Sequence, residues 1–207
     1  TATAAAIHEL RARYPQLVLV GVEPALKPAT QLTSTGRVGV MATKGTVGSD
    51  KFQRLLASMD PGTRFEVKAC NGLALAIEQS TLPAHASAAQ AEVDRLLQQY
   101  VGELGPFGKQ SGQMDTLVLG CTHYVFAQDK LQQLVGPEVR LISTGEPVAR
   151  HTQRLLEAAG LLNPQAAPAH AHGRVALYTT GDLPGLRAAA QRWLHLPGGD
   201  CHAAVGV

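Results

Sequence analysis

The sequence predicts an α/β protein built mainly from parallel strands. Short apolar runs, each long enough for one buried strand, alternate with segments of helical periodicity. Turns rich in glycine, proline or polar residues separate these segments. With 207 residues, 45% of them hydrophobic, the chain is long enough to build a sizeable core.

The first part of the chain sets this alternation. Residues 1–14 are alanine-rich and predict a helix, and the run Leu-Val-Leu-Val-Gly-Val at 17–22 predicts a buried strand. Pro24 and Pro28 interrupt the connection after that run. The next expected elements are a strand at Arg37–Ala42, a helix at 49–59 with Ser49 or Asp50 as N-cap, a strand at 65–69, a short helix at Leu73–Gln79 and a longer one at 86–101.

The second part begins with a glycine-rich loop at 102–112 and repeats the pattern. Residues 162–173, rich in alanine and proline, predict a surface linker, and the tail after Pro197 predicts an edge segment or a frayed end. The remaining expected elements are a central strand at Thr116–Leu119, a helix at Gln128–Val135, a strand at 139–142, a helix from 145 to about 159 opened by a Thr144 cap with Pro147 in its first turn, a strand at 175–179 and a helix at 183–196.

Composition excludes several classes of function. A net charge of +2 with scattered basic residues gives no reason to expect nucleic acid or an anionic membrane. No apolar stretch approaches the roughly 20 residues that a membrane span needs. The three cysteines form no Cys-x-x-Cys pair, which argues for free thiols in a reducing compartment and against a disulfide framework or a structural zinc site.

The most informative segment is Gly120-Cys121-Thr122-His123, at the end of the expected central strand. Residues i and i+2 of an extended chain point to one face, and open α/β sheets bind ligands at the carboxyl ends of their strands. Cys121 and His123 are therefore expected to face one crevice, where an imidazole can favour the reactive thiolate. The alternatives are a buried structural thiol or a nucleophilic Cys-His pair for acyl transfer.

Residues 120–124, Gly-Cys-Thr-His-Tyr, resemble the second catalytic-cysteine motif of glutamate racemase. Three further segments are similar to that family: residues 18–29 to its inter-domain connection, 38–52 to the opening of its second domain, and 139–150 to its return to the first domain. The resemblance covers most of the chain and is weakest over 164–207.

The resemblance implies two similar α/β lobes with mainly parallel sheets flanked by helices and an active site in the cleft between them. Residues 1–35 with 143–207 would form the first lobe, and 36–142 the second. It further implies cofactor-independent racemisation of L- and D-glutamate by two cysteines, supplying D-glutamate for peptidoglycan in the cytoplasm. A homodimer is possible in that family, and no cofactor, metal, nucleic acid or membrane partner is expected.

The start of the chain bears on this expectation. Thr1-Ala2-Thr3 resembles the residues directly after the first catalytic cysteine of the family, in a Cys-Asn-Thr-Ala segment. That cysteine and its Asn, an Asp-Ser-Gly segment and a Pro-Tyr-Gly loop do not occur before Thr1. The 207-residue polypeptide is therefore expected not to racemise glutamate, because inversion needs an acid and a base on opposite faces of the α-carbon.

The resemblance also implies site residues. Cys121 would be the acid/base thiol, His123 its proton partner, and Glu78 a nearby catalytic carboxylate, although a helix-surface role for Glu78 is about equally expected. His123 favours glutamate over aspartate, since related aspartate racemases tend to have Glu there. Substrate-binding residues would be Thr1, Thr122, His123, Thr43 and Thr46, although Thr43 and Thr46 could equally cap a helix. Cys70 is expected to be structural.

Three alternatives to a glutamate racemase remain open on the sequence alone. The chain could be an aspartate racemase of the same superfamily, an enzyme of Cys-His acyl transfer, or an inactive fragment or binding relative. The flanking segments argue against acyl transfer.

Overall fold

The computed structural model describes residues 2–82, 85–163 and 175–204, with backbone only for 2–5. The chain divides into two compact units. The first comprises Thr1–Ala74 and Asp94–Leu162, and the second Leu75–Val93 and Asn163–Val207. The lobe boundaries drawn from the resemblance stay a prediction.

A four-stranded sheet forms the centre of the first unit. Its strands are β1 (Arg37–Ala42), β2 (Arg64–Ala69), β3 (Thr116–Leu119) and β4 (Arg140–Ile142), in the order β2-β1-β3-β4 with every pairing parallel. Parallel neighbours need crossover connections, which explains the helices between them. The prediction that the strand at Thr116–Leu119 is central is confirmed.

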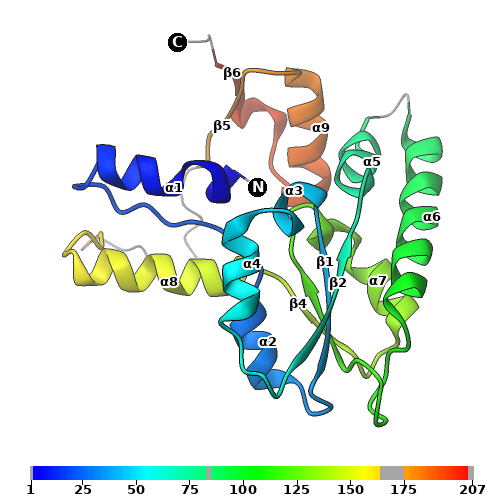
Figure 1. Cartoon of the computed structure of the whole chain (residues 1–207). Coiled ribbons are helices and arrows are strands. Elements are labelled where there is room, and N and C mark those ends of the chain that lie inside the picture. The colour runs from blue at the N-terminus through cyan, green and yellow to red at the C-terminus, as the bar shows by residue number, and fades with distance from the viewer. Residues whose placement is uncertain (1, 83–84, 164–174, 205–207) are drawn as a thin grey trace. The chain divides into compact units, whose positions relative to one another are not determined.

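Helices cover both faces of this sheet, as Figure 1 shows. On one side lie α2 (Leu26–Leu32) and α4 (Asp50–Ala57), and on the other α7 (Gln128–Val135) and the C-terminal part of α6 (Ala86–Leu104). Because side chains alternate along a strand, Val118 joins the core on the α2 side while Leu117 and Leu119 point the other way. The buried residues of the α2-side core are Ala25, Leu26, Ala29, Val38, Val40, Phe52, Val118 and Ile142.

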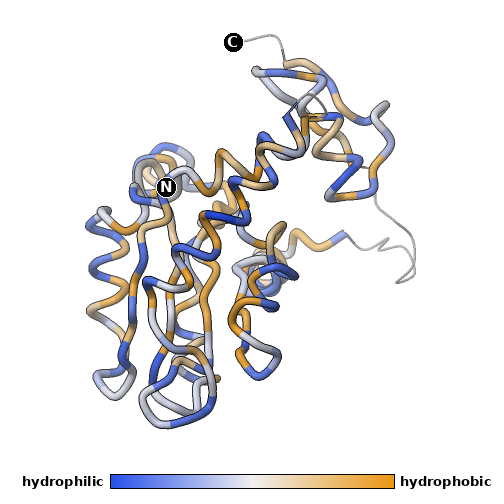
Figure 2. The backbone as a smooth tube through the Cα atoms, turned by 90° about the vertical axis from the view of Figure 1, so that its right-hand side faces the viewer, coloured by the Kyte–Doolittle hydropathy of each residue, from blue (hydrophilic) through white to orange (hydrophobic). Residues whose placement is uncertain are grey.

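Helices α4 and α7 are amphipathic, and Figure 2 shows short hydrophobic and hydrophilic stretches alternating along the helices. Helix α4 begins as predicted, since the Ser49 hydroxyl accepts from the Phe52 N–H at 3.2 Å. The other helices of the first unit are α1 (Ala2–Arg13), α3 (Lys44–Val47), the 3₁₀ turn η1 (Tyr124–Ala127) and α8 (Gly145–Ala158), and α5 (Leu73–Gln79) crosses the boundary between the units.

Asp115, only 4% exposed, ties the start of β3 to the turn after α2. One carboxylate oxygen accepts from the Thr33 hydroxyl at 2.6 Å, and the other from the Ser34 N–H and hydroxyl, each at 2.6 Å. The Thr35 N–H also donates to this second oxygen, and the Thr116 hydroxyl donates to the first, each at 3.1 Å. Burial opposes ionisation here, but these donated bonds outweigh it and lower the pKa of Asp115 below its ordinary value.

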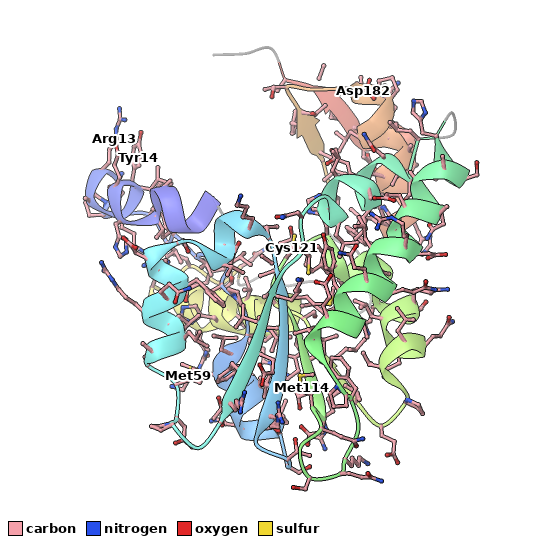
Figure 3. All side chains as sticks on the ribbon, turned by 45° about the vertical axis from the view of Figure 1, so that its right-hand side comes forward. Arg13, Tyr14, Met59, Met114, Cys121 and Asp182 are labelled. Atoms are coloured by element: carbon pink, nitrogen blue, oxygen red, sulfur yellow. The ribbon has the colours of Figure 1, made fainter. Side chains whose placement is uncertain are left out.

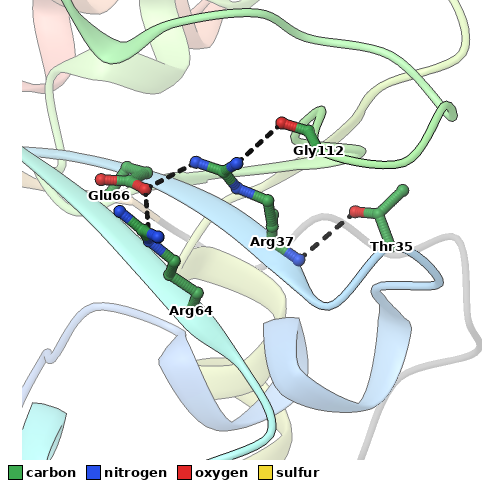
Figure 4. Close-up of polar contacts among 5 residues, drawn as sticks. All are labelled: Thr35, Arg37, Arg64, Glu66 and Gly112. Carbon is green, nitrogen blue, oxygen red and sulfur yellow. Dashed lines mark hydrogen bonds and ion pairs between the residues drawn. The ribbon is translucent and has the colours of Figure 1, made fainter.

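A second polar cluster, drawn in Figure 4, joins the first residues of β1 and β2. Arg37 and Arg64 both donate to Glu66 at 2.8 Å, and Arg37 also donates to the carbonyl of Gly112 at 2.9 Å. The ion pairs are partly exposed, so each contributes little to stability by itself. Their position connects the loop before β3 to the same end of the sheet.

The second unit contains a small parallel sheet and a helix. Strand β5 (Leu177–Thr179) pairs with β6 (Cys201–Ala203), and α9 (Leu183–Leu194) comes after β5. The Asp182 side chain caps α9 by accepting from the Gly185 N–H at 2.7 Å. The tail after Pro197, expected as an edge segment or frayed end, therefore contributes a short strand. Most of the predicted linker at 162–173 lies outside the described residues.

Two expectations about the first unit are wrong. Residues 17–22 form no strand: Leu17 is 54% exposed, and the run pairs with no described strand. Residues 26–32, expected as an irregular connection, form α2, because Pro28 occupies the first turn, where a proline removes no helical hydrogen bond. The loop expected at 102–112 begins later than predicted, since α6 continues to Leu104.

Candidate active site

The site is built at the carboxyl end of β3, where Gly120 lets two strands approach closely. The Gly120 N–H donates to the carbonyl of Met41 at 2.7 Å, which extends the pairing of β3 with β1 by one residue. A Cβ at Gly120 would lie 2.9 Å from that carbonyl and 3.0 Å from the Cβ of Ala42. Any other residue would push the chain away from β1 and move the neighbouring cysteine.

Cys121 lies at this end of the sheet, and Met114, which precedes β3, lies at the other end (Figure 3). Its Sγ is 3.8 Å from Nδ1 of His123, within hydrogen-bonding distance for sulfur. The two side chains meet through a turn and not through strand alternation, since the Tyr124 N–H donates to the Cys121 carbonyl at 3.1 Å. A short polar turn after a buried strand thus places a thiol beside an imidazole.

The pair opens onto a pocket of about 380 Å³, near the lower end of the range for small-molecule sites. Of the expected site residues, Cys121, Thr122, His123, Thr43 and Thr46 all line it. The remaining lining residues, which sequence reasoning did not single out as site residues, are Val22, Glu23, Pro24, Ala74, Gly120 and Thr144.

Thr43 and Thr46 line the pocket and also form the N-terminal cap of α3. The Thr43 side chain accepts from the Thr46 N–H at 3.2 Å and thereby caps α3, and the two hydroxyls lie 2.9 Å apart. The capping alternative for Thr43 therefore holds. It does not exclude a substrate contact, because both residues remain on the pocket wall.

Two expected site residues lie elsewhere. Glu78 is in α5, on the part that belongs to the second unit, and does not line this pocket. Thr1 lies outside the described residues. The roles inferred for both residues stay predictions.

Glu23 brings a carboxylate to the pocket wall. Its Oε1 lies 2.6 Å from Nζ of Lys51 in α4, so the ammonium group balances its charge. Thr144 occupies the N-cap position of α8 as expected, but its side chain makes no capping hydrogen bond. The prediction of a Thr144 side-chain cap is therefore wrong.

The described residues contain no group of three or more His, Cys, Asp or Glu side chains placed to hold a metal ion. Over the same part of the chain, no helix is both long enough and apolar enough to cross a membrane. The pocket itself offers a thiol, an imidazole, a carboxylate and several hydroxyl groups.

Comparison with known proteins finds similar curated sequences. No family model matches the chain. A glutamate racemase of Ectopseudomonas mendocina is 45% identical over 188 residues, which are 91% of this chain and 65% of that protein. One from Herpetosiphon aurantiacus is 43% identical over 183 residues, or 88% of this chain and 65% of that protein. About nine tenths of this chain is therefore similar to proteins named glutamate racemase.

Solved structures of glutamate racemases share the fold. An isoform from Bacillus anthracis superposes with a TM-score of 0.76 at 25% identity, covering 100% of this chain and 70% of that one. The Thermus thermophilus racemase, solved with β-chloro-D-alanine, gives a TM-score of 0.61 at 28% identity, covering 92% of this chain and 64% of that one. The chain thus spans about two thirds of the length of these racemases.

The three thiols of this chain differ in access to solvent. Cys70 and Cys201 are each only 2% exposed, whereas Cys121 is half-buried on the pocket wall. Burial raises the pKa of the Cys70 thiol to about 12, which keeps it protonated at neutral pH. Its surroundings are those of the structural cysteine that the sequence predicted.

Proposed function

We propose that this chain carries one acid/base half of a glutamate racemase site, with Cys121 as the group that transfers the α-proton on one face of the substrate. The observation that carries the proposal is the 3.8 Å contact between Cys121 Sγ and His123 Nδ1 on the wall of a small pocket. Relatives over 40% identical named glutamate racemase support the substrate.

In the proposed step, His123 takes the proton of the Cys121 thiol and leaves a thiolate facing the substrate. The thiolate removes the α-proton and becomes a thiol again, while the electron pair stays on the α-carbon and its carboxylate. Net inversion then requires a second acid to protonate the opposite face. Among the described residues, Cys121 is the only cysteine that lines this pocket, so the described part of the pocket provides one thiol and not two.

The proposal extends to the biological role implied by the family. The reaction would supply D-glutamate for peptidoglycan in the cytoplasm, with no cofactor. Thr122, Thr43 and Thr46 would bind the substrate through their hydroxyl groups, with Thr1 and the Glu78 carboxylate also contributing. A homodimer is part of the same proposal.

The test separates proton exchange from racemisation. Purified protein of this sequence is incubated with L- or D-glutamate in deuterium oxide. Deuterium at the α-carbon is measured by mass spectrometry, and the circular dichroism of the amino acid reports net racemisation. A single thiol can remove a proton and return a solvent deuteron to the same face. We expect exchange of one enantiomer, L-glutamate, without net racemisation, and loss of that exchange in Cys121→Ser.

Three other results of this experiment would change the proposed function. Sustained racemisation by this polypeptide, abolished by Cys121→Ser, would show that another residue supplies the second proton and would overturn the one-thiol proposal. Exchange of L-aspartate in preference to L-glutamate would identify the substrate as aspartate. Absence of exchange with both, in a folded protein, would favour a binding relative without activity.

A further inference from the structure

The hydroxyl of Thr144 lies on the same pocket and makes no hydrogen bond within the described part of the chain. Thr144 is only 7% exposed, it lines the pocket that holds Cys121, and its side chain does not cap the helix that it precedes. Among the described residues that are not exposed, Arg37 Nε is the one side-chain nitrogen or oxygen that is inaccessible to solvent and has no hydrogen-bond partner. The Thr144 hydroxyl has no partner among the described residues either, but it is not among these inaccessible atoms. The Thr144 hydroxyl therefore reaches the pocket surface.

The local sequence explains why this hydroxyl is not used as a helix cap. An N-cap side chain normally accepts from the N–H of the second or third helical residue. The third residue of α8 is Pro147, which has no N–H. Thr144 also has helical dihedrals, φ −84° and ψ −13°, where an N-cap residue is ordinarily extended. The hydroxyl is thus left available to a ligand.

The electrostatic surroundings favour an anionic ligand. Thr144 is at the N-terminus of α8, a helix of 14 residues whose dipole places partial positive charge there. The one carboxylate in the first turn, Glu146, pairs with Arg150 and lines a separate groove with it. Glu23, on the pocket wall, is balanced by Lys51 at 2.6 Å.

We propose that Thr144 is a substrate-binding residue, whose Oγ1–H donates a hydrogen bond to a carboxylate of the amino acid in the pocket. This inference rests on the proposed function, since it takes the ligand to be the racemase substrate. It assigns to the turn between β4 and α8 a direct part in substrate binding. The carboxylate can be the α- or the γ-group of glutamate.

The test measures binding without requiring turnover. Iodoacetamide alkylates Cys121, and a ligand that fills the pocket slows this reaction, so the glutamate concentration giving half-maximal protection reports its affinity. Thr144→Val replaces the hydroxyl with a methyl group of equal size, and Thr144→Ser keeps the hydroxyl. Thr152→Val is the matched control on α8, because the Thr152 hydroxyl donates to the Val148 carbonyl at 2.8 Å, away from the pocket.

We expect Thr144→Val to raise the half-protecting glutamate concentration roughly tenfold or more, as for loss of a hydrogen bond to a charged group. Thr144→Ser should restore most of the affinity, and Thr152→Val should leave it unchanged. The melting temperature of Thr144→Val should shift by no more than about 2 °C, because no intramolecular bond is lost. If Thr144→Val unfolds, Thr144→Ser against Thr144→Ala provides the same comparison.

Two ligands identify the carboxylate. Glutamine lacks the γ-carboxylate, and isoglutamine lacks the α-carboxylate. If Thr144→Val does not change the protection given by one of these ligands, that ligand lacks the carboxylate that Thr144 binds. Equal protection by glutamate in wild type and Thr144→Val would overturn the Thr144 inference and leave the proposed function standing. Absence of any protection of the wild-type thiol would overturn both.

Discussion

At the scale of single residues, the surroundings of the three thiols differ enough to separate their reactivities. Cys121 lies on the pocket wall, with Nδ1 of His123 3.8 Å from its Sγ. Cys70 is 2% exposed, and burial raises the pKa of its thiol to about 12. Alkylating reagents attack the thiolate, so burial and the raised pKa both slow the reaction of Cys70.

We therefore predict that limiting iodoacetamide at neutral pH modifies Cys121 at least about tenfold faster than Cys70 in the folded protein. Peptide mass spectrometry after a time course measures both rates. The same time course in denaturant is the control, because the rates should converge once burial is removed. Equal rates in the folded state would mean that the region around Cys70 opens readily.

The candidate site was predictable from the sequence where its residues are close in the chain. Cys121 and His123 are two positions apart at the end of an apolar run, so their meeting needed only the strand to end at that place. Glu23 and Thr144 reach the same pocket from distant segments, and only the tertiary fold brings them there. For Thr144 the signal was Pro147, which lacks the N–H that a cap would use.

At the scale of elements, Asp115 joins the turn after α2 to the first residue of β3. The carboxylate accepts from hydroxyls and backbone N–H groups of residues 33–35 and 116, and Oδ2 alone accepts both N–H groups. An asparagine has the same shape but must present its NH₂ group to some of these donors. Such a substitution leaves buried donors unsatisfied.

We predict that Asp115→Asn lowers the free energy of unfolding by about 2–4 kcal/mol, measured by urea denaturation at neutral pH. The pKa of Asp115 is depressed in the folded state, so its contribution is complete above the unfolded-state pKa and is lost as the pH falls below about 4. The variant should therefore lose less stability than wild type between about pH 5 and about pH 2.

Asp129→Asn is the matched control for this experiment, because Asp129 is exposed in the first turn of α7. It should change stability by no more than about 0.5 kcal/mol. A stability of Asp115→Asn equal to that of wild type at neutral pH would show that the polar cluster does not hold the turn against β3.

Strands and helices were predictable from the sequence where a hydrophobic run or its turn boundaries decided the structure. The β1, β2 and β3 runs are bounded by turn residues, and each lies where the sequence placed it, to within one residue. The run at 17–22 has the same apolar character, yet no described strand pairs with it, since hydrophobicity does not reveal whether a partner is available. Pro28 predicts an interruption of the chain, yet α2 forms around it because a proline in the first turn is compatible with a helix.

At the scale of the whole molecule, the sheets of the two units differ in how far the surrounding structure buries them. In the first, β1 and β3 are interior strands whose residues from Val38 to Ala42 and from Thr116 to Leu119 are buried between two helical layers. In the second, β5 and β6 form a sheet of two short parallel strands, and Tyr178 is 67% exposed. Parallel sheets are ordinarily covered on both faces, and an isolated pair of strands is only marginally stable.

These differences predict a gradient of local stability. Amides of β1 and β3 should exchange with deuterium only through opening of the first unit's core, whereas those of β5 and β6 can exchange by local fraying of a two-stranded ladder. We predict that peptides covering Arg37–Ala42 and Thr116–Leu119 exchange at least about 100-fold more slowly than those covering Leu177–Thr179 and Cys201–Ala203. Hydrogen exchange followed by mass spectrometry at neutral pH gives both rates, and a fully denatured sample supplies the intrinsic rate for each peptide. Protection of β5 and β6 equal to that of β1 and β3 would mean that the small sheet is as strongly supported as the central one, and would require a cover for its exposed face.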